Sequence, residues 1–195
     1  MNDRRLTATE RTELLALARR TLAERLHHAG ADELPAPPTG PGLQQHRGAF
    51  VTLTLAGHLR GCIGTFRPQE PLWKVVQSMA ISAAIHDPRF HPVQADELAA
   101  IEIEISALTP LRVITDIEQI EVGTHGLYIT RGPAGGVLLP QVAVEYGWSR
   151  TEFLQQTCRK AGLPAEAWQQ GATIEIFGAE VFSESAPDGG KVSCA

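Results

Sequence analysis

Residues 101–106 (IEIEIS) alternate strictly between apolar and polar side chains. A period of two is the pattern of a β-strand that has one buried and one polar face. Two further pairs of β-rich segments are each joined by a short turn, at residues 49–55 with 59–66 and at residues 126–130 with 137–139. Both pairs predict β-hairpins, so the strands of this chain are expected to pair mainly in an antiparallel manner.

Three segments have the apolar periodicity of helices. Capping boxes mark the start of two of them, at Thr7 with Glu10 and at Ser149 with Glu152. These two helices are predicted to end near Gly30 and Ala161, and the third helix is predicted at residues 72–85. The third helix is apolar on one broad face and nearly uncharged on the other, which is typical of a helix buried on more than one side.

Helices and hairpins alternate here without the regular rhythm of βαβ units, and no G-x-G-x-x-G fingerprint follows a strand. The sequence therefore predicts an α+β fold with a mixed, mostly antiparallel sheet and flanking helices. One domain is expected over residues 1–184, with a Pro/Gly-rich surface connection at 35–45 and a flexible tail at 185–195. The final strand is predicted at residues 173–183, bent at Gly178.

Composition excludes several classes of protein. The formal net charge of −5 and an aromatic content of 6% argue against binding to a nucleic-acid backbone. The chain has no apolar run of ~18 residues and its N-terminus is charged, so the sequence predicts a soluble cytoplasmic protein without a membrane segment. The 3 cysteines are too widely spaced for a zinc site, so no metal is expected, and no motif identifies a cofactor.

The segment with the strongest chemical signal is Arg60-Gly61-Cys62-Ile63-Gly64 in the first hairpin. Glycine weakens a strand, so Gly61 and Gly64 are expected to permit a bulge or the close approach of another backbone or a ligand. In a regular strand Arg60 and Cys62 share one face, where the arginine would favour a reactive thiolate. The alternative is a small buried cysteine in a tight hairpin.

The general base for such a thiol is open between His86, His91 and His125, because no histidine spacing selects one of them. Asp87 and Arg89 lie in a proline-constrained loop (DPRF, residues 87–90). This pair is predicted either to hold the end of the preceding helix or to bind a ligand.

Other polar groups have two interpretations each. Glu102 and Glu104 share a strand face, which suits an acid–base pair or a solvated outer face of the sheet. Gln141 follows a strand end and is a candidate for the rim of a cleft. Cys158 is predicted to pack in the core, and Cys194 is predicted to lie in the tail.

The hexapeptide at residues 59–64 (LRGCIG) matches, letter for letter, the hallmark of the AMMECR domain family, which includes the AmmeMemoRadiSam system protein A. The similarity continues through residues 48–53 and 87–90, and then through His125 and residues 138–143 as far as the last strand. This resemblance covers nearly the whole chain and implies a fold with a larger and a smaller subdomain.

The resemblance also implies a partnership with a Memo-like protein and a radical-SAM protein, although the family has no established activity. One hypothesis is a cysteine-dependent enzyme or enzyme subunit acting on a small-molecule substrate. In it Cys62 is the nucleophile, Arg60 stabilises negative charge and His125 is the leading base. The alternative hypothesis is a non-catalytic module in which the residue 60–64 hairpin and the loop with Asp87 and Arg89 recognise a partner protein.

Overall fold

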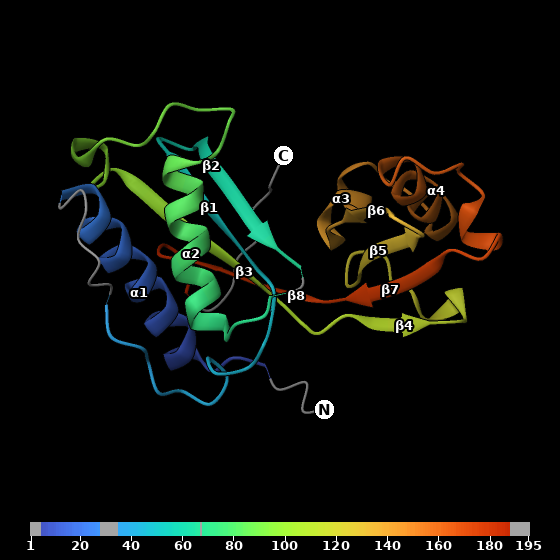
Figure 1. Ribbon diagram of the computed structural model, residues 1–195, viewed down its shortest axis with the longest axis horizontal. Helices are drawn as coiled ribbons and strands as arrows, with labels where there is room; N and C mark the ends of the chain where they lie inside the picture. Colours follow the sequence, from blue (N-terminus) through green and yellow to red (C-terminus); the bar gives the residue numbers. More distant parts are fainter. Residues whose placement is uncertain (1–4, 28–34, 67, 188–195) are drawn as a thin grey trace. The chain divides into compact units, whose positions relative to one another are not determined.

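Two four-stranded sheets, each with its own helices, make up the fold (Figure 1). The computed structural model describes residues 5–27, 35–66 and 68–187. The larger unit contains the described residues up to Leu108 and those from Glu180 onward, and the smaller unit spans Thr109–Ala179. The predicted α+β class is therefore confirmed.

The larger unit has the strand order β2-β1-β3-β8. Its strands are β1 (Ala49–Leu55), β2 (His58–Thr65), β3 (Ile101–Leu108) and β8 (Ala179–Ser183). Strand β1 pairs antiparallel with both β2 and β3, as the hairpin pattern predicted for β1 and β2. Helices α1 (Ala8–His27) and α2 (Leu72–Ile85) cover one face of this sheet (Figure 1).

The core of the larger unit lies between this sheet and its two helices. Apolar side chains from β1 and β3, such as Val51 and Ile103, pack with Leu14 of α1 and Val76 of α2, and all four are fully buried. The predicted capping box begins α1: the backbone N–H of Glu10 donates to the Thr7 hydroxyl, and that of Thr7 donates to the Glu10 carboxylate. The predicted end of this helix at Gly30 lies outside the described residues.

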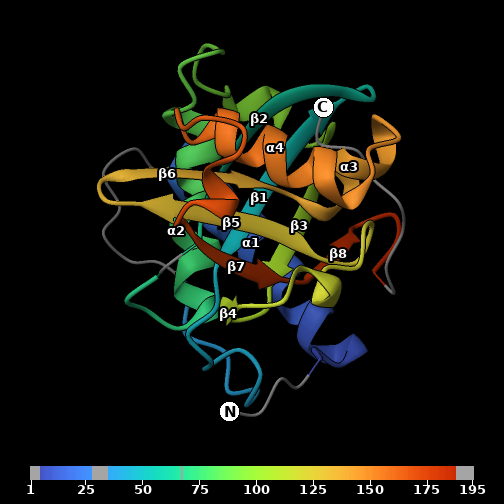
Figure 2. The ribbon, with the colours of Figure 1, turned by 90° about the vertical axis from the view of Figure 1, so that its right-hand side faces the viewer.

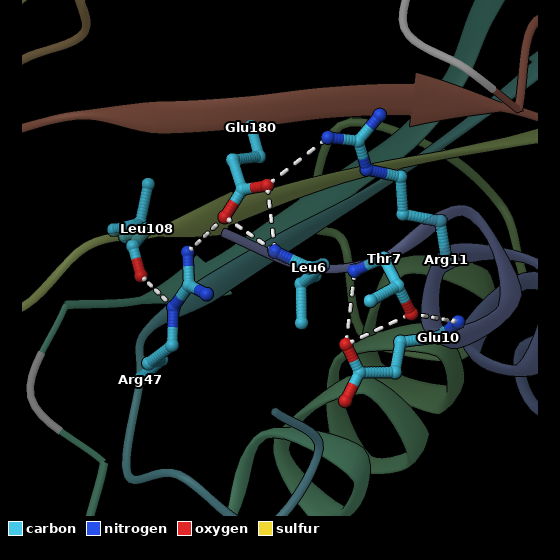
Figure 3. Close-up of polar contacts among 7 residues, drawn as sticks. All are labelled: Leu6, Thr7, Glu10, Arg11, Arg47, Leu108 and Glu180. Carbon is cyan, nitrogen blue, oxygen red and sulfur yellow. Dashed lines mark hydrogen bonds and ion pairs between the residues drawn. The ribbon is translucent and has the colours of Figure 1, made fainter. Parts of the chain in front are cut away.

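A buried arginine fastens the segment before β1 to two neighbouring strands, at the end of β3 and the start of β8 (Figure 3). Arg47, which is 2% exposed, donates from Nε to the Leu108 carbonyl at 2.7 Å and forms an ion pair with Glu180 at 2.7 Å. Glu180 also accepts from the backbone N–H of Leu6 and from the Arg11 guanidinium. One carboxylate of β8 thus anchors the segments before α1 and before β1.

The smaller unit has the strand order β4-β7-β5-β6 (Figure 2). Its elements are β4 (Arg112–Ile114), β5 (Gly126–Arg131), β6 (Ala134–Leu138), α3 (Pro140–Glu145), α4 (Arg150–Lys160) and β7 (Thr173–Phe177). The described residues also form short 3-10 turns at Ala95–Glu97 in the larger unit and at Ile117–Gln119 and Ala167–Gln169 in the smaller one. Strand β7 pairs antiparallel with β4 and β5, and β5 pairs antiparallel with β6.

Helix α4 supplies the apolar side chains that cover the smaller sheet. Phe153 and Leu154 of α4 are fully buried with Leu127 and Ile129 of β5. The predicted capping box begins this helix, because the Ser149 hydroxyl accepts from the backbone N–H of Glu152 and the Glu152 carboxylate accepts from that of Ser149.

The structure corrects one expectation and adds two elements. The single strand predicted at residues 173–183 is two strands, β7 and β8, which belong to different sheets and separate at Gly178. Residues after Leu139 form the short helix α3, and Arg112–Ile114 forms a strand that the sequence did not predict. No helix of the described part of the chain is long and apolar enough to cross a bilayer.

Candidate functional site

A β-bulge interrupts the β1–β2 hairpin at the arginine of the hexapeptide. Leu53 pairs with Gly61 and Thr54 pairs with Leu59, so Arg60 lies opposite no residue of β1. A bulge resets the alternation of side chains along a strand. Regular alternation, from which Arg60 and Cys62 were expected to share a face, therefore does not hold across Arg60.

The two glycines of the hexapeptide provide space for packing inside the larger unit. A Cβ atom at Gly61 would lie 2.1 Å from the carbonyl oxygen of Ala83, so α2 approaches the backbone of β2 at this residue. A Cβ atom at Gly64 would lie 2.3 Å from the ring of Phe50, its cross-strand partner. Of the predicted uses for these glycines, the structure shows a bulge next to Gly61 and close approach of another backbone to it.

The DPRF loop holds the backbone of Cys62 on both sides. The Asp87 carboxylate accepts the Cys62 N–H at 2.9 Å, and the Arg89 guanidinium donates to the Cys62 carbonyl at 3.3 Å. These two side chains act on the outer edge of β2, which is the edge strand of its sheet. The loop thus takes the hydrogen-bonding place of a further strand.

Asp87 and Arg89 also bind each other. The Asp87 side chain is 2% exposed and receives hydrogen bonds from Nε, Nη2 and the backbone N–H of Arg89. The Arg89 side chain holds the pKa of the Asp87 carboxyl well below its usual range, although burial acts in the opposite direction. The pair directly follows α2 and binds the backbone of β2, and its two predicted roles, holding the end of α2 and binding a ligand, stay predictions.

Arg60 forms a second ion pair beside the first. Its Nε and Nη2 donate to the two carboxylate oxygens of Glu97 at 2.8 and 2.9 Å, and its Nη1 donates to the His91 carbonyl at 2.7 Å. The hydrogen bond with Glu97 raises the pKa of Arg60 and lowers that of Glu97. The Arg60 charge, which the sequence was expected to place beside the Cys62 thiol, is thus paired with the Glu97 carboxylate.

An open pocket of about 390 Å³ lies on the outer side of this loop. It is lined by Arg60, Pro88, Arg89, Phe90 and His91. The Arg89 side chain is 51% exposed, and its guanidinium carbon lies 5.4 Å from the centre of the Phe90 ring. The rim of this pocket therefore presents planar, partly exposed groups.

Cys62 is a half-buried residue, and its thiol lies beside a hydroxyl. Thr52 is its direct partner on β1, and the Thr52 hydroxyl donates to the Cys62 sulfur at 3.3 Å. Thr52 also pairs with Glu104 of β3, so a thiol, a hydroxyl and a carboxylate lie in one row across three strands. Glu104 is only 4% exposed, so the interpretation of its face as a solvated outer surface is wrong at this residue.

The remaining predicted site residues lie in the smaller unit or away from the row. His125 directly precedes β5, and its Nδ1 accepts the backbone N–H of Glu121 at 3.1 Å. Gln141 is in the first turn of α3. His86 and His91 are both exposed. His125 as base and Gln141 as binding residue stay predictions, whereas Arg60, Gly61, Cys62, Gly64, Asp87 and Arg89 occur together in the larger unit.

The other two cysteines differ from Cys62. Cys158 is fully buried in the core of the smaller unit, and burial raises the pKa of its thiol. The predicted packing role of Cys158 is thereby confirmed. Cys194 lies outside the described residues. Among the described residues, no group of three His, Cys, Asp or Glu side chains could hold a metal ion.

Sequence reasoning missed Thr52 and Glu97 as members of the site. The register of the predicted hairpin could have identified Thr52, because a two-stranded pairing places it opposite Cys62. No local signal marks Glu97, which is 37 residues from Arg60 in the chain.

Comparison with known proteins supplies the family. The AMMECR1 family model matches residues 15–182. A protein of Methanosarcina barkeri is 43% identical, and the match covers 94% of this chain and 95% of that protein. A protein of Methanothermobacter thermautotrophicus is 44% identical, with coverage of 92% and 96%. The crystal structure of an uncharacterised protein from Pyrococcus horikoshii is 40% identical and has a TM-score of 0.76, covering 91% of this chain and 93% of that one.

Proposed function

The chain belongs to the AMMECR1 family, and from that premise we propose that it is a cysteine-dependent enzyme, or the cysteine-bearing subunit of one, with Cys62 as its nucleophile. The observation that carries this proposal is that the backbone of Cys62 is held on both sides while the residue is only half-buried. Asp87 and Arg89 bind its N–H and its carbonyl. A nucleophile needs a fixed position and access to substrate, and a core cysteine such as Cys158 needs neither.

In this proposal the residues around Cys62 have separate roles. Arg60 acts through the loop, because its ion pair with Glu97 and its bond to the His91 carbonyl hold residues 91–97 beside β2. Asp87 and Arg89 position the nucleophile. For the base we propose the buried Glu104, in the row with Thr52, in place of the His125 that the sequence predicts. The Nδ1 of His125 already accepts a backbone N–H, so its Nε2 carries the proton in the neutral ring and acts as a donor. This favours Glu104 as the base.

The substrate and partners follow from the resemblance of the sequence to the AMMECR domain proteins of the AmmeMemoRadiSam system. We propose that the chain acts with a Memo-like protein and a radical-SAM protein on a small molecule. A purified mixture of the three proteins tests the association, and absence of a complex at micromolar concentration would contradict it.

Alkylation of the native protein by iodoacetamide tests the nucleophile. A Cys194→Ser background removes the tail thiol, and Cys158 then serves as the internal control for a buried cysteine. We expect Cys62 to be alkylated at neutral pH in the folded protein, at a rate that rises with the thiolate fraction, while Cys158 reacts only after unfolding. A Cys62 that reacts no faster than Cys158 would exclude the enzyme proposal.

The alternative proposal, a non-catalytic binding module, is favoured by one observation. The pocket beside the hexapeptide is open, and its rim includes the partly exposed Arg89, Phe90 and His91. If this rim recognises a partner protein, Phe90→Ala should abolish co-purification with the Memo-like or radical-SAM protein, and Cys62→Ala should leave it intact. The reverse pattern would favour the enzyme. Arg60→Glu is a poor probe because it would also expel Glu97 from the loop.

A further inference from the structure

We infer that Thr52 is a positioning residue that stabilises the thiolate form of Cys62. This inference rests on the proposed role of Cys62 as a nucleophile, and it identifies the group that keeps the thiol reactive. Sequence reasoning assigned that role to Arg60, whereas the hydroxyl nearest the sulfur belongs to the neighbouring strand.

The Thr52 hydroxyl is placed to donate a hydrogen bond to the Cys62 sulfur. Thr52 and Cys62 are direct cross-strand partners in β1 and β2, and the hydroxyl donates to the sulfur at 3.3 Å. A threonine hydroxyl has one proton to donate, and the Cys62 sulfur is an acceptor within its reach. Thr52 is 3% exposed, and its branched side chain is stiff at χ1, so the donor is held in place.

A hydrogen bond to the charged form of a group favours that form, which for a thiol is the thiolate. The charged groups near Cys62 do not supply this stabilisation alone. Asp87 places a negative charge at the Cys62 N–H, and Arg89, which contacts the Cys62 carbonyl, is paired with Asp87. Arg60 is paired with Glu97.

Glu104 adds a further acidic side chain to the environment of Cys62, because it lies in the same cross-strand row on the other side of Thr52. The charged side chains named around the thiol are thus three acidic ones, Asp87, Glu97 and Glu104, and two basic ones, Arg60 and Arg89. These charges therefore do not favour the thiolate of Cys62 by themselves. The Thr52 hydroxyl, a neutral donor to the sulfur, is the group that does.

The test compares variants of Thr52 in the Cys194→Ser background. Thr52→Val keeps the shape of the side chain and removes the hydroxyl, and Thr52→Ser keeps the hydroxyl. Thr54→Val is the matched control, because Thr54 lies on the same face of β1 and pairs with Leu59 instead of Cys62. The measurement is the rate of Cys62 alkylation by iodoacetamide between pH 5 and 10, followed by mass spectrometry of the labelled peptide.

We expect Thr52→Val to move the midpoint of the pH–rate profile upward by about one unit, which corresponds to roughly tenfold less thiolate at neutral pH. Thr52→Ser and Thr54→Val should keep the parental midpoint. If Thr52→Val does not fold, as judged by circular dichroism, Thr52→Ala removes the same hydroxyl without a second branch and replaces it in the comparison.

Two results would overturn the inference in different ways. An unchanged midpoint in Thr52→Val, with Cys62 still reactive, removes the role of Thr52 and leaves Cys62 as the nucleophile. A parental Cys62 that stays unreactive across the pH range removes both the inference and the proposed function.

Discussion

Gly61 is the residue of the hexapeptide at which an added methyl group meets the hardest obstacle. Its Cβ would lie 2.1 Å from the Ala83 carbonyl oxygen, which is backbone of α2 and cannot rotate away. Gly61→Ala must therefore push α2 from β2, and overpacking of this kind costs about 1–3 kcal/mol. We expect a decrease of about 2 kcal/mol in the free energy of unfolding, measured by urea denaturation.

An exposed residue of the same strand provides the control for this prediction. His58 begins β2 and is exposed, so His58→Ala should change the free energy of unfolding by less than about 0.5 kcal/mol. A Gly61→Ala protein as stable as His58→Ala would show that α2 does not approach the hairpin as closely as described.

At the scale of single residues, the sequence predicted the members of the loop better than their partners. The Asp87–Arg89 pair was predicted because the two residues are close in the chain and constrained by proline. The partner of Arg60 was not predicted, because a bulge turns the arginine away from the alternation and toward Glu97. Bulges depend on contacts distant in the chain, and two glycines in a strand indicate only that one is possible.

The loop that follows α2 is an element held by buried charge. Asp87 accepts hydrogen bonds from Arg89 and from the Cys62 N–H, and hydrogen bonds to charged groups are worth about 1.5–3 kcal/mol each. Asp87→Asn replaces the charge and keeps the shape. We expect it to lower the free energy of unfolding at pH 7 by about 2 kcal/mol, measured by urea denaturation.

The same pair makes this loss depend on pH. Arg89 depresses the pKa of Asp87 in the folded state, so the stabilisation is complete above the unfolded value of about 3.9 and is lost as the pH falls through the lower folded value. The difference between wild type and Asp87→Asn should therefore be constant from pH 7 to about 5 and shrink below about pH 4. A difference that changes between pH 7 and 5 would assign the effect to another group.

Elements with local end signals were predicted with accurate starts. Thr7 with Glu10 and Ser149 with Glu152 form the predicted capping boxes. By contrast, the single strand expected at residues 173–183 is divided between two sheets. The apolar pattern continues through Gly178 whether the segment is one strand or two. What divides it is strand pairing: β7 lies between β4 and β5, whereas β8 lies next to β3 in the other sheet.

For the whole molecule, the larger unit is assembled from two parts of the chain, before and after the smaller unit, and one buried arginine joins them. Leu108 is the last residue before the chain enters the smaller unit, and Glu180 is the first after it returns. Arg47 binds both of them (Figure 3). Arginines are usually exposed, so no sequence pattern marked Arg47 as part of the core.

This arrangement predicts coupling between Arg47 and Glu180 in the stability of the fold. Removing one partner of a buried pair leaves the other charge uncompensated and costs about 3–5 kcal/mol. Glu180 keeps the Arg11 guanidinium and the Leu6 N–H, so the loss in Arg47→Met should lie near the lower end, at about 3 kcal/mol. Arg159→Met, at an exposed position of α4, should change the free energy of unfolding by less than about 0.5 kcal/mol.

A double-mutant cycle measures the coupling itself. Arg47→Met, Glu180→Gln and the double variant are compared by urea denaturation, and the double variant should be more stable than the sum of the single losses predicts, by about 1–3 kcal/mol. The reason is that each single change already breaks the 2.7 Å ion pair, so the second change has less to remove. Additive losses would instead mean that Arg47 stabilises the unit through the Leu108 carbonyl alone, and β8 would then be held by its strand pairing and by the bonds of Glu180 to Leu6 and Arg11.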